Sequence, residues 1–262
     1  MLSSLTILSA YVLLALPAAA IGLPWTLITS DISFLYRWSM WILRAGLRLA
    51  RIRVEVSGRE WIPAGQACIF MANHISNLDP PILLSLLPFR SAFFLKRSLL
   101  KIPLLGYGMR LGNFIPVDRD GRPESARASV EYAQSVLALG VNVSTFPEGT
   151  RSRTGKMLPF KKGPFFLAMQ SGAPVVPVSI WGTETMMTKG TLRIRPGTAH
   201  IAFHPAIDPR QFSTREQLVS VVRAAIASAL PARMRDEPMK NGVGELPVSP
   251  GNRAHRQEGE AL

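Results

Sequence analysis

Residues 69–80 read Ile-Phe-Met-Ala-Asn-His-Ile-Ser-Asn-Leu-Asp-Pro and pass from a strand through a turn to the start of a helix. The apolar run Ala67–Ala72 is typical of a strand. Asp79 precedes two prolines and the apolar run Ile82–Leu87, and a proline directly after an aspartate is typical of a helix start. We therefore expect His74 just beyond the end of a strand and Asp79 at or near the N-cap of a helix.

His74 and Asp79 can meet only if the chain bends between them. On one continuous helix, residues at this spacing would point about 140° apart. Ser76-Asn77 supplies turn chemistry between them. A histidine held by a carboxylate suits a general base, because the carboxylate fixes the tautomer and leaves the other ring nitrogen free to accept a proton. The alternative is that Asp79 merely caps the next helix, and the spacing alone favours that alternative.

Composition predicts a single α/β-sized domain with an anionic partner. The chain has 262 residues, is 47% hydrophobic and carries a formal net charge of +13. Such a charge suits phosphate-bearing substrates, an acidic membrane face or nucleic acid. The single cysteine, Cys68, cannot form an internal disulfide and has the position of a structural thiol. No Cys/His cluster has zinc spacing, and His200, His204 and His255 are expected to be structural or surface residues.

The N-terminal 30 residues carry no charged side chain. Leu5–Ile28 is long enough to cross a bilayer, for which about 20 apolar residues suffice. Pro17 and Pro24 would kink such a helix. A signal peptide is the alternative, but the segment has no Lys or Arg before its apolar run. We expect membrane anchoring, by a spanning helix or by a kinked hairpin in one leaflet.

Residues 32–51 have the pattern of a basic amphipathic helix. Arg37, Arg44, Arg48 and Arg51 share one helical face. This pattern is typical of a helix lying in an anionic membrane interface. A helix packed on the domain with an exposed basic face is the other interpretation, and the two are compatible. The arginine excess places the following domain in the cytoplasm.

Strand and helix patterns alternate from Val54 onward, which predicts an α/β domain with a mixed, largely parallel sheet flanked by helices. We expect membrane-anchoring helices over residues 1–53, the α/β domain over 54–230 and a disordered tail over 231–262. The predicted strands are Val54–Val56, Ala67–Ala72, Ala92–Leu95, Phe114–Val117, Asn142–Phe146, Val175–Trp181, Leu192–Arg195 and His200–Phe203. The predicted helices are Pro81–Leu87, Leu99–Leu111, Glu124–Leu139, Gly163–Gln170 and Thr214–Ala229.

A second cluster follows the predicted strand that ends at Phe146, where residues 146–153 read Phe-Pro-Glu-Gly-Thr-Arg-Ser-Arg. A glycine in a strand-to-loop turn lets the backbone approach a ligand closely. Two arginines and two hydroxyls beside it suit a phosphate, because guanidinium groups match phosphate oxygens. Lys156, Lys161 and Lys162 extend the positive field. Taken alone, such a loop is as often simply solvated.

Together, Asn73-His74-x4-Asp79 and residues 146–153 resemble the glycerolipid acyltransferase family, and most closely its 1-acylglycerol-3-phosphate (lysophosphatidate) acyltransferases. Residues 112–119, Gly-Asn-Phe-Ile-Pro-Val-Asp-Arg, are similar to the family's substrate-binding segment. Residues 176–180 resemble its apolar fourth block, and residues 96–106 resemble its linker. Pro116 departs from the pattern, because an apolar strand residue is expected there.

The resemblance implies transfer of an acyl group from a thioester to the sn-2 hydroxyl of 1-acylglycerol 3-phosphate, which gives phosphatidate in phospholipid biosynthesis. It implies His74 as general base, oriented by Asp79, and no cofactor beyond acyl-CoA or acyl carrier protein as co-substrate. It also implies a membrane-associated enzyme, at an inner or plasma membrane, with anionic lipids as partners and the catalytic domain in the cytoplasm. The implied substrate-binding residues are Arg119, Glu148, Gly149, Thr150 and Arg151, with Glu148 orienting Arg151 or contacting the glycerol.

Two alternatives stay open at this stage. A related acyltransferase could act on another lysophospholipid, a lyso-aminolipid or glycerol 3-phosphate, because the motifs are shared. A non-enzymatic, membrane-anchored protein that binds phosphate or nucleic acid would also use the +13 charge. A nucleic-acid partner is not expected, because the sequence has no known binding motif with interleaved aromatic residues.

Overall fold

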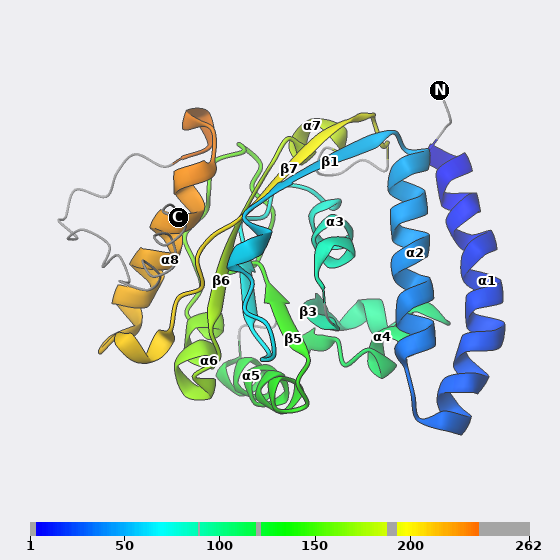
Figure 1. The fold of residues 1–262 in the computed structure, drawn as a ribbon, viewed down its shortest axis with the longest axis horizontal. Helices are drawn as coiled ribbons and strands as arrows, with labels where there is room; N and C mark the ends of the chain where they lie inside the picture. The colour runs from blue at the N-terminus through cyan, green and yellow to red at the C-terminus, as the bar shows by residue number, and fades with distance from the viewer. Residues whose placement is uncertain (1–3, 89, 119–121, 188–192, 236–262) are drawn as a thin grey trace, which may run out of the picture.

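A seven-stranded sheet forms the centre of the molecule, in the order β1-β7-β6-β2-β5-β3-β4 (Figure 1). The computed structural model describes residues 4–88, 90–118, 122–187 and 193–235. β6 and β7 are antiparallel, and all other neighbouring strands are parallel. The predicted fold class is therefore confirmed. The strands are β1 (Ile52–Ser57), β2 (Ile69–Ala72), β3 (Ser91–Lys96), β4 (Ile115–Val117), β5 (Asn142–Thr145), β6 (Val175–Trp181) and β7 (Gly197–Phe203).

Helices cover both faces of the sheet (Figure 1). The central strand β2 needs this cover on both faces, because all four of its residues are fully buried. Successive side chains point to opposite faces of the sheet and so enter two different cores. Phe70 and Ala72 pack with α2 and α3, whereas Ile69 and Met71 pack with α5, α6 and α8. The α-helices are α1 (Ser4–Thr29), α2 (Ser33–Leu49), α3 (Asp79–Leu86), α4 (Leu105–Leu111), α5 (Pro123–Ala138), α6 (Gly163–Ser171), α7 (Thr183–Met186) and α8 (Arg215–Ala229). The 3-10 helices are η1 (Arg59–Trp61), η2 (Arg97–Lys101), η3 (Pro209–Gln211) and η4 (Ala232–Met234).

The parallel arrangement brings distant segments of the chain to one edge of the sheet. Met71 in β2 pairs with Thr145 in β5 on one side and with Pro177 in β6 on the other. The three strands therefore end close together. The segments that follow them are the turn at residues 73–79, the loop at 146–153 and the start of α7.

The first two helices form an antiparallel pair beside the domain (Figure 1). A Cβ on Gly22 would lie 2.9 Å from Leu35 Cδ1, so the helices approach closely at this glycine. Met40 and Leu47 of α2 belong to a core of the domain, and Arg44 donates to the Ser85 carbonyl of α3 at 2.9 and 3.1 Å. α2 is thus part of the folded domain. Within the described parts of the chain, no helix combines the length and the apolar character that a bilayer-spanning helix needs.

The structure differs from the sequence-based expectations in three places. The predicted helix over 99–111 is broken between η2 and α4. Pro103 and Leu104 interrupt it, and Leu104 has a φ of +60°. The predicted strand over 192–195 is wrong, because residues 193–196 are irregular, and Leu192 lies outside the described residues. Order extends past Leu230, because η4 follows and Met234 is 1% exposed. Residues 236–262 of the predicted tail lie outside the described residues.

Candidate active site

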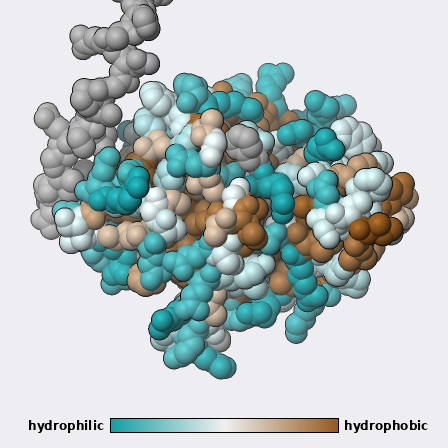
Figure 2. All heavy atoms as spheres, turned by 60° about the horizontal axis from the view of Figure 1, so that its bottom comes forward, coloured by the Kyte–Doolittle hydropathy of each residue, from teal (hydrophilic) through white to brown (hydrophobic). Residues whose placement is uncertain are grey.

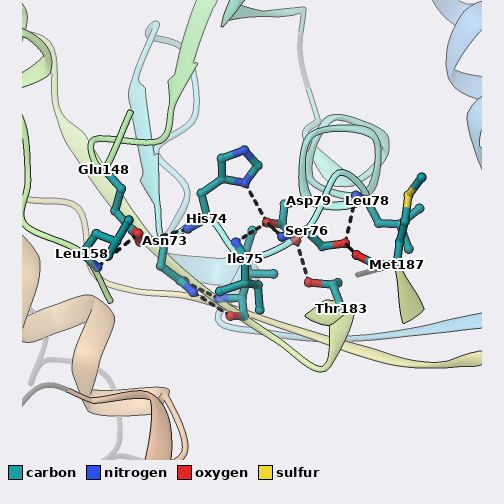
Figure 3. Close-up of polar contacts among 11 residues, drawn as sticks. Asn73, His74, Ile75, Ser76, Leu78, Asp79, Glu148, Leu158, Thr183 and Met187 are labelled. Carbon is teal, nitrogen blue, oxygen red and sulfur yellow. Dashed lines mark hydrogen bonds and ion pairs between the residues drawn. The ribbon is translucent and has the colours of Figure 1, made fainter. Parts of the chain in front are cut away.

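The turn that carries the histidine is fastened to β6 by the side chain of Asn73. Its amide nitrogen donates to the Ile180 carbonyl and its amide oxygen accepts from the Ile180 N–H, both at 2.8 Å (Figure 3). Asn73 is 1% exposed, so both bonds are shielded from water. The backbone just before His74 is therefore held on the neighbouring strand.

The predicted contact between His74 and Asp79 is present. His74 Nδ1 lies 2.8 Å from Asp79 Oδ2, and the same oxygen accepts from the backbone N–H groups of Ile75 and Ser76, each at 2.8 Å (Figure 3). Asp79 is 0% exposed and the His74 side chain 15% exposed. A carboxylate that accepts so many bonds is acting as an anion, so Nδ1 carries the proton that points at it. His74 Nε2 is left to accept a proton.

The capping alternative for Asp79 is wrong. α3 begins at Asp79, and the next two residues, Pro80 and Pro81, have no backbone N–H to donate. The carboxylate therefore turns back to the residues before it and closes the turn that starts at His74. The two prolines that start the helix thus also direct the aspartate toward the histidine.

Phe146 fixes the plane of the imidazole. The two rings are stacked, with centroids 4.1 Å apart and planes 17° apart. Phe93 packs in turn on Phe146, with centroids 5.7 Å apart. The His74 ring is thus held at one edge by Asp79 and on one face by Phe146, which leaves it little rotational freedom.

Glu148 binds the backbone beneath the histidine. Its Oε1 accepts from the His74 N–H at 3.0 Å and its Oε2 from the Leu158 N–H at 3.1 Å. The residue is 3% exposed. Burial raises the pKa of Glu148 to about 7, although the two N–H donors and Arg223 act in the opposite direction. Through these two backbone partners, Glu148 tethers the turn to the loop. That it orients Arg151 or contacts the glycerol stays a prediction.

The loop after β5 is docked on the same turn. Gly149 has φ of +69°, and its N–H donates to the Phe146 carbonyl at 2.9 Å. The Ser152 N–H donates to the His74 carbonyl at 2.8 Å. The aliphatic part of Lys161 crosses Gly149 so closely that a Cβ there would lie 2.6 Å from Lys161 Cε. The backbone of His74 is thus bonded to the loop through both its N–H and its C=O.

The other predicted substrate residues are placed unequally. Arg151 is partly buried and directly precedes Ser152, whose N–H is bonded to His74. Thr150 is exposed. Arg119 lies outside the described residues. The three lysines at 156, 161 and 162 are exposed, as a solvated positive field requires.

The residues set aside by the sequence have structural contacts. Cys68 is 1% exposed, and burial raises the pKa of its thiol to about 11, which suits a structural thiol. His204 Nε2 lies 2.8 Å from Ser179 Oγ, whose hydroxyl donates to the Ile226 carbonyl. His200 Nδ1 lies 3.1 Å from a Glu55 carboxylate oxygen, and its ring stacks on Trp181. His255 lies outside the described residues.

One polar partner of the pair was not found from the sequence. Thr183 Oγ1 donates to Asp79 Oδ1 at 2.6 Å, and Thr183 is 0% exposed (Figure 3). The sequence feature that could have indicated Thr183 is its place directly after Gly182, at the end of the predicted buried strand Val175–Trp181. That position shares the edge at which His74 lies. The site as built can take a proton from a bound hydroxyl at His74 Nε2 and stabilise the resulting imidazolium through Asp79.

Comparison with known proteins gives consistent matches. A family model described as Acyltransferase matches residues 53–181. A 1-acyl-sn-glycerol-3-phosphate acyltransferase of Borreliella burgdorferi is 33% identical over 190 residues, which cover 72% of this chain and 76% of that protein. One from Chlamydomonas reinhardtii is 36% identical over 185 residues, which cover 70% of this chain and 54% of that protein. The match thus spans about half the length of the algal relative.

A solved structure matches over most of the chain. The crystal structure of the 1-acyl-sn-glycerophosphate acyltransferase of Thermotoga maritima superposes with a TM-score of 0.72 at 30% sequence identity. The match covers 85% of this chain and 92% of that one.

Proposed function

The chain belongs to the 1-acylglycerol-3-phosphate acyltransferase family, and on that premise we propose that it transfers an acyl group from a thioester to the sn-2 hydroxyl of 1-acylglycerol 3-phosphate, giving phosphatidate. The observation that carries the proposal is the 2.8 Å contact between His74 and the buried Asp79. The loop over 146–153 is bonded to the backbone of that same histidine.

The chemical step balances without a covalent enzyme intermediate. His74 Nε2 takes the proton of the sn-2 hydroxyl as its oxygen attacks the thioester carbonyl, and Asp79 stabilises the imidazolium. The new C–O bond forms, the C–S bond breaks, and the departing thiolate recovers the proton from His74. Because a thiolate is a good leaving group, no further cofactor is required. General-base assistance of this kind contributes about 10²- to 10⁴-fold in rate.

Arg151 is our candidate for the substrate phosphate, together with Arg119. A guanidinium can bind two phosphate oxygens at once. The bond from the Ser152 N–H to the His74 carbonyl fixes the backbone beside Arg151 relative to the base. Gly149 allows the turn, Thr150 offers an exposed hydroxyl, and Glu148 holds the loop on the turn.

The direct test uses the full-length protein with lysophosphatidate and an acyl thioester, and it follows phosphatidate and free thiol together. We expect turnover in the wild type, and loss of turnover in His74→Ala with an unchanged circular dichroism spectrum. His200→Ala is the matched control, because that histidine is bonded to Glu55 away from the turn. Full turnover in His74→Ala would remove the histidine from the mechanism.

The acceptor and the donor are resolved by parallel arms of the same assay. Lysophosphatidate is compared with another lysophospholipid, a lyso-aminolipid and glycerol 3-phosphate, each with acyl-CoA and with acylated carrier protein. Arg151→Ala should raise the KM for lysophosphatidate, because it removes a ground-state contact with the phosphate. Arg127→Ala is the control, since this exposed arginine pairs with Glu131 on α5. An effect of Arg151→Ala on kcat alone would contradict a phosphate contact.

We further propose that the enzyme works on the cytoplasmic face of an anionic inner or plasma membrane. α1 exposes large apolar side chains, among them Trp25 at 52% and Ile28 at 84%. Figure 2 shows apolar residues gathered at the right of the molecule, where α1 lies in Figure 1. Arg37, Arg48 and Arg51 are exposed along the neighbouring segment. Apolar side chains beside arginines are typical of a surface that binds an anionic bilayer.

A second exposed segment supports the same membrane contact. Between β3 and β4, Ile102, Leu104 and Leu105 are 43%, 49% and 50% exposed. The sequence from 91 to 117 contains no acidic residue, and its cations are exposed. An environment-sensitive dye on Leu104→Cys should shift to the blue with anionic vesicles. Buried Cys68 stays unlabelled, and Leu139→Cys at the end of α5 is the control. An unchanged dye at position 104 on vesicle-bound protein would contradict this contact.

A further inference from the structure

Asp79 must present its carboxylate to His74 in one orientation, and the two carboxylate oxygens are held differently. Oδ2 faces the turn and binds His74 Nδ1 together with two backbone N–H groups. Oδ1 faces away from the turn and accepts from Thr183 Oγ1 at 2.6 Å (Figure 3). A hydroxyl-to-carboxylate bond of this length is charge-assisted and among the stronger hydrogen bonds in proteins.

The sharp turn before Thr183 fixes where its side chain lies. It follows Gly182, which has φ of +90°, and a Cβ at Gly182 would lie 2.3 Å from the Thr198 carbonyl oxygen. The chain therefore makes a sharp turn between β6 and α7, with β7 directly behind it. Thr183 is the first residue of α7 and is 0% exposed. Its side chain is thus aimed at the carboxylate by a turn that only glycine fits.

The same segment holds the turn at a second point. Ser76 Oγ donates to the Met187 carbonyl at 3.0 Å, and Ser76 is also 0% exposed. Thr183 and Met187 lie just within and just beyond the ends of α7, so this short helix is bonded to both ends of the segment that runs from Ser76 to Asp79. Buried polar groups of this kind specify one arrangement when all of them are satisfied.

We propose that Thr183 is a positioning residue for the reaction, whose hydroxyl holds Asp79 Oδ1 so that Oδ2 stays directed at His74 Nδ1. It contacts neither the thioester nor the acceptor and acts only through the carboxylate. The activity readout of this inference rests on the proposed function. The orientation of Asp79 can also be read without turnover.

Removal of the hydroxyl should affect the chemical step and its pH dependence. Thr183→Val keeps a side chain of similar volume beside Asp79 but removes the hydroxyl that donates to Oδ1. A hydrogen bond to a charged group contributes about 10- to 100-fold in equilibrium terms, so we expect kcat to fall by about 10-fold or more. The KM for lysophosphatidate should stay within about twofold, since Thr183 is 0% exposed and its hydroxyl is bonded to Asp79. Without this donor, the pair takes up a proton more readily, so the acid limb of the kcat profile moves to higher pH.

Two further variants separate the hydroxyl from the packing of the side chain. Thr183→Ser keeps the hydroxyl and removes the methyl group, so it should restore most of the lost kcat and the original pH profile. Thr185→Val makes the same chemical change two residues along α7, where the residue is exposed and its hydroxyl donates to the Gly182 carbonyl rather than to Asp79. It should behave as the wild type.

An NMR titration of His74 in the full-length protein gives the readout that needs no substrate. We expect the titration midpoint of its ring to rise in Thr183→Val and to stay in place in Thr183→Ser and Thr185→Val. The proposal fails if Thr183→Val matches Thr185→Val, if Thr183→Ser is as impaired as Thr183→Val, or if only KM changes. If the wild type shows no turnover, the proposed function fails, whereas the titration still decides whether Thr183 acts on the pair.

Discussion

Glu148 makes a testable contribution to stability that depends on pH. Glu148 is 3% exposed, and burial raises the pKa of its carboxyl group from the ordinary 4.5 to about 7. At pH values between 4.5 and about 7, Glu148 keeps its proton in the folded protein and releases it in the unfolded chain. The free energy of unfolding therefore falls as pH rises through this interval. The stabilisation is fully present below pH 4.5 and is lost as pH passes about 7.

The size of the effect follows from that interval. One pH unit corresponds to about 1.4 kcal/mol, so the range from 4.5 to about 7 amounts to about 3 kcal/mol of unfolding free energy. Glu148→Gln removes the titrating group but keeps one oxygen for the N–H of His74 or Leu158. The other N–H then faces an amide group, which adds a loss of about 1 kcal/mol that does not depend on pH. The difference in unfolding free energy between the variant and the wild type should therefore have one part that is constant with pH and one part that changes with pH.

The measurement is urea unfolding of both proteins in a non-ionic detergent between pH 4.5 and pH 8, followed by tryptophan fluorescence. The stability advantage of the wild type over Glu148→Gln should shrink by about 3 kcal/mol across this range. All other titrating groups cancel in the difference. Glu131→Gln is the control, because that carboxylate is exposed on α5 and should give no such slope. A flat difference for Glu148→Gln, or one that grows with pH, would refute the reasoning.

Three substitutions around the same turn give further expected outcomes. Asn73→Ala leaves the N–H and C=O of Ile180 unpaired in the core and should lower the unfolding free energy by about 2–4 kcal/mol, measured by the same urea titration. Gly149→Ala places a Cβ at φ of +69° and against Lys161, and should cost about 1–2 kcal/mol and reduce turnover; unchanged stability would show that the loop adapts freely. Phe146→Leu removes the ring stacked on His74 and should lower kcat several-fold while the fold, monitored by circular dichroism, is kept.

The contacts that could be predicted from sequence are those made within a short stretch of chain. His74 and Asp79 are five residues apart, and the turn residues and prolines between and after them indicate how they meet. The strand pattern of β2 and β6 was equally readable, because β2 is a continuous apolar run and β6 is nearly one. The strand expected over 192–195 is wrong because that segment lacks an apolar run. Among its described residues, 193–195, Ile194 packs on the core, and the arginines on either side of it are exposed.

The partners that could not be predicted are distant in sequence. The N–H of His74 reaches Glu148 across 74 residues, Asp79 reaches Thr183 across 104, and Asn73 reaches Ile180 across 107. Periodicity reports which face of an element is buried, but it does not report which buried polar group meets which. The backbone contacts of Glu148 are an example, because a glutamate beside arginines in the sequence gives no sign of the two distant N–H groups from which it accepts.

These distant contacts explain how a short, irregular turn can hold a general base. The backbone around His74 is bonded to two distant parts of the chain: its N–H and its C=O to the loop after β5, and the side chain of the preceding Asn73 to β6. Asp79, which orients the ring, is bonded to the start of α7. The base thus lies where three parallel strands end, and its precision comes from the rigid sheet. A turn of the same sequence without these strands would lose the buried partners that keep the carboxylate directed at the imidazole, so the chemistry depends on the fold rather than on the motif alone.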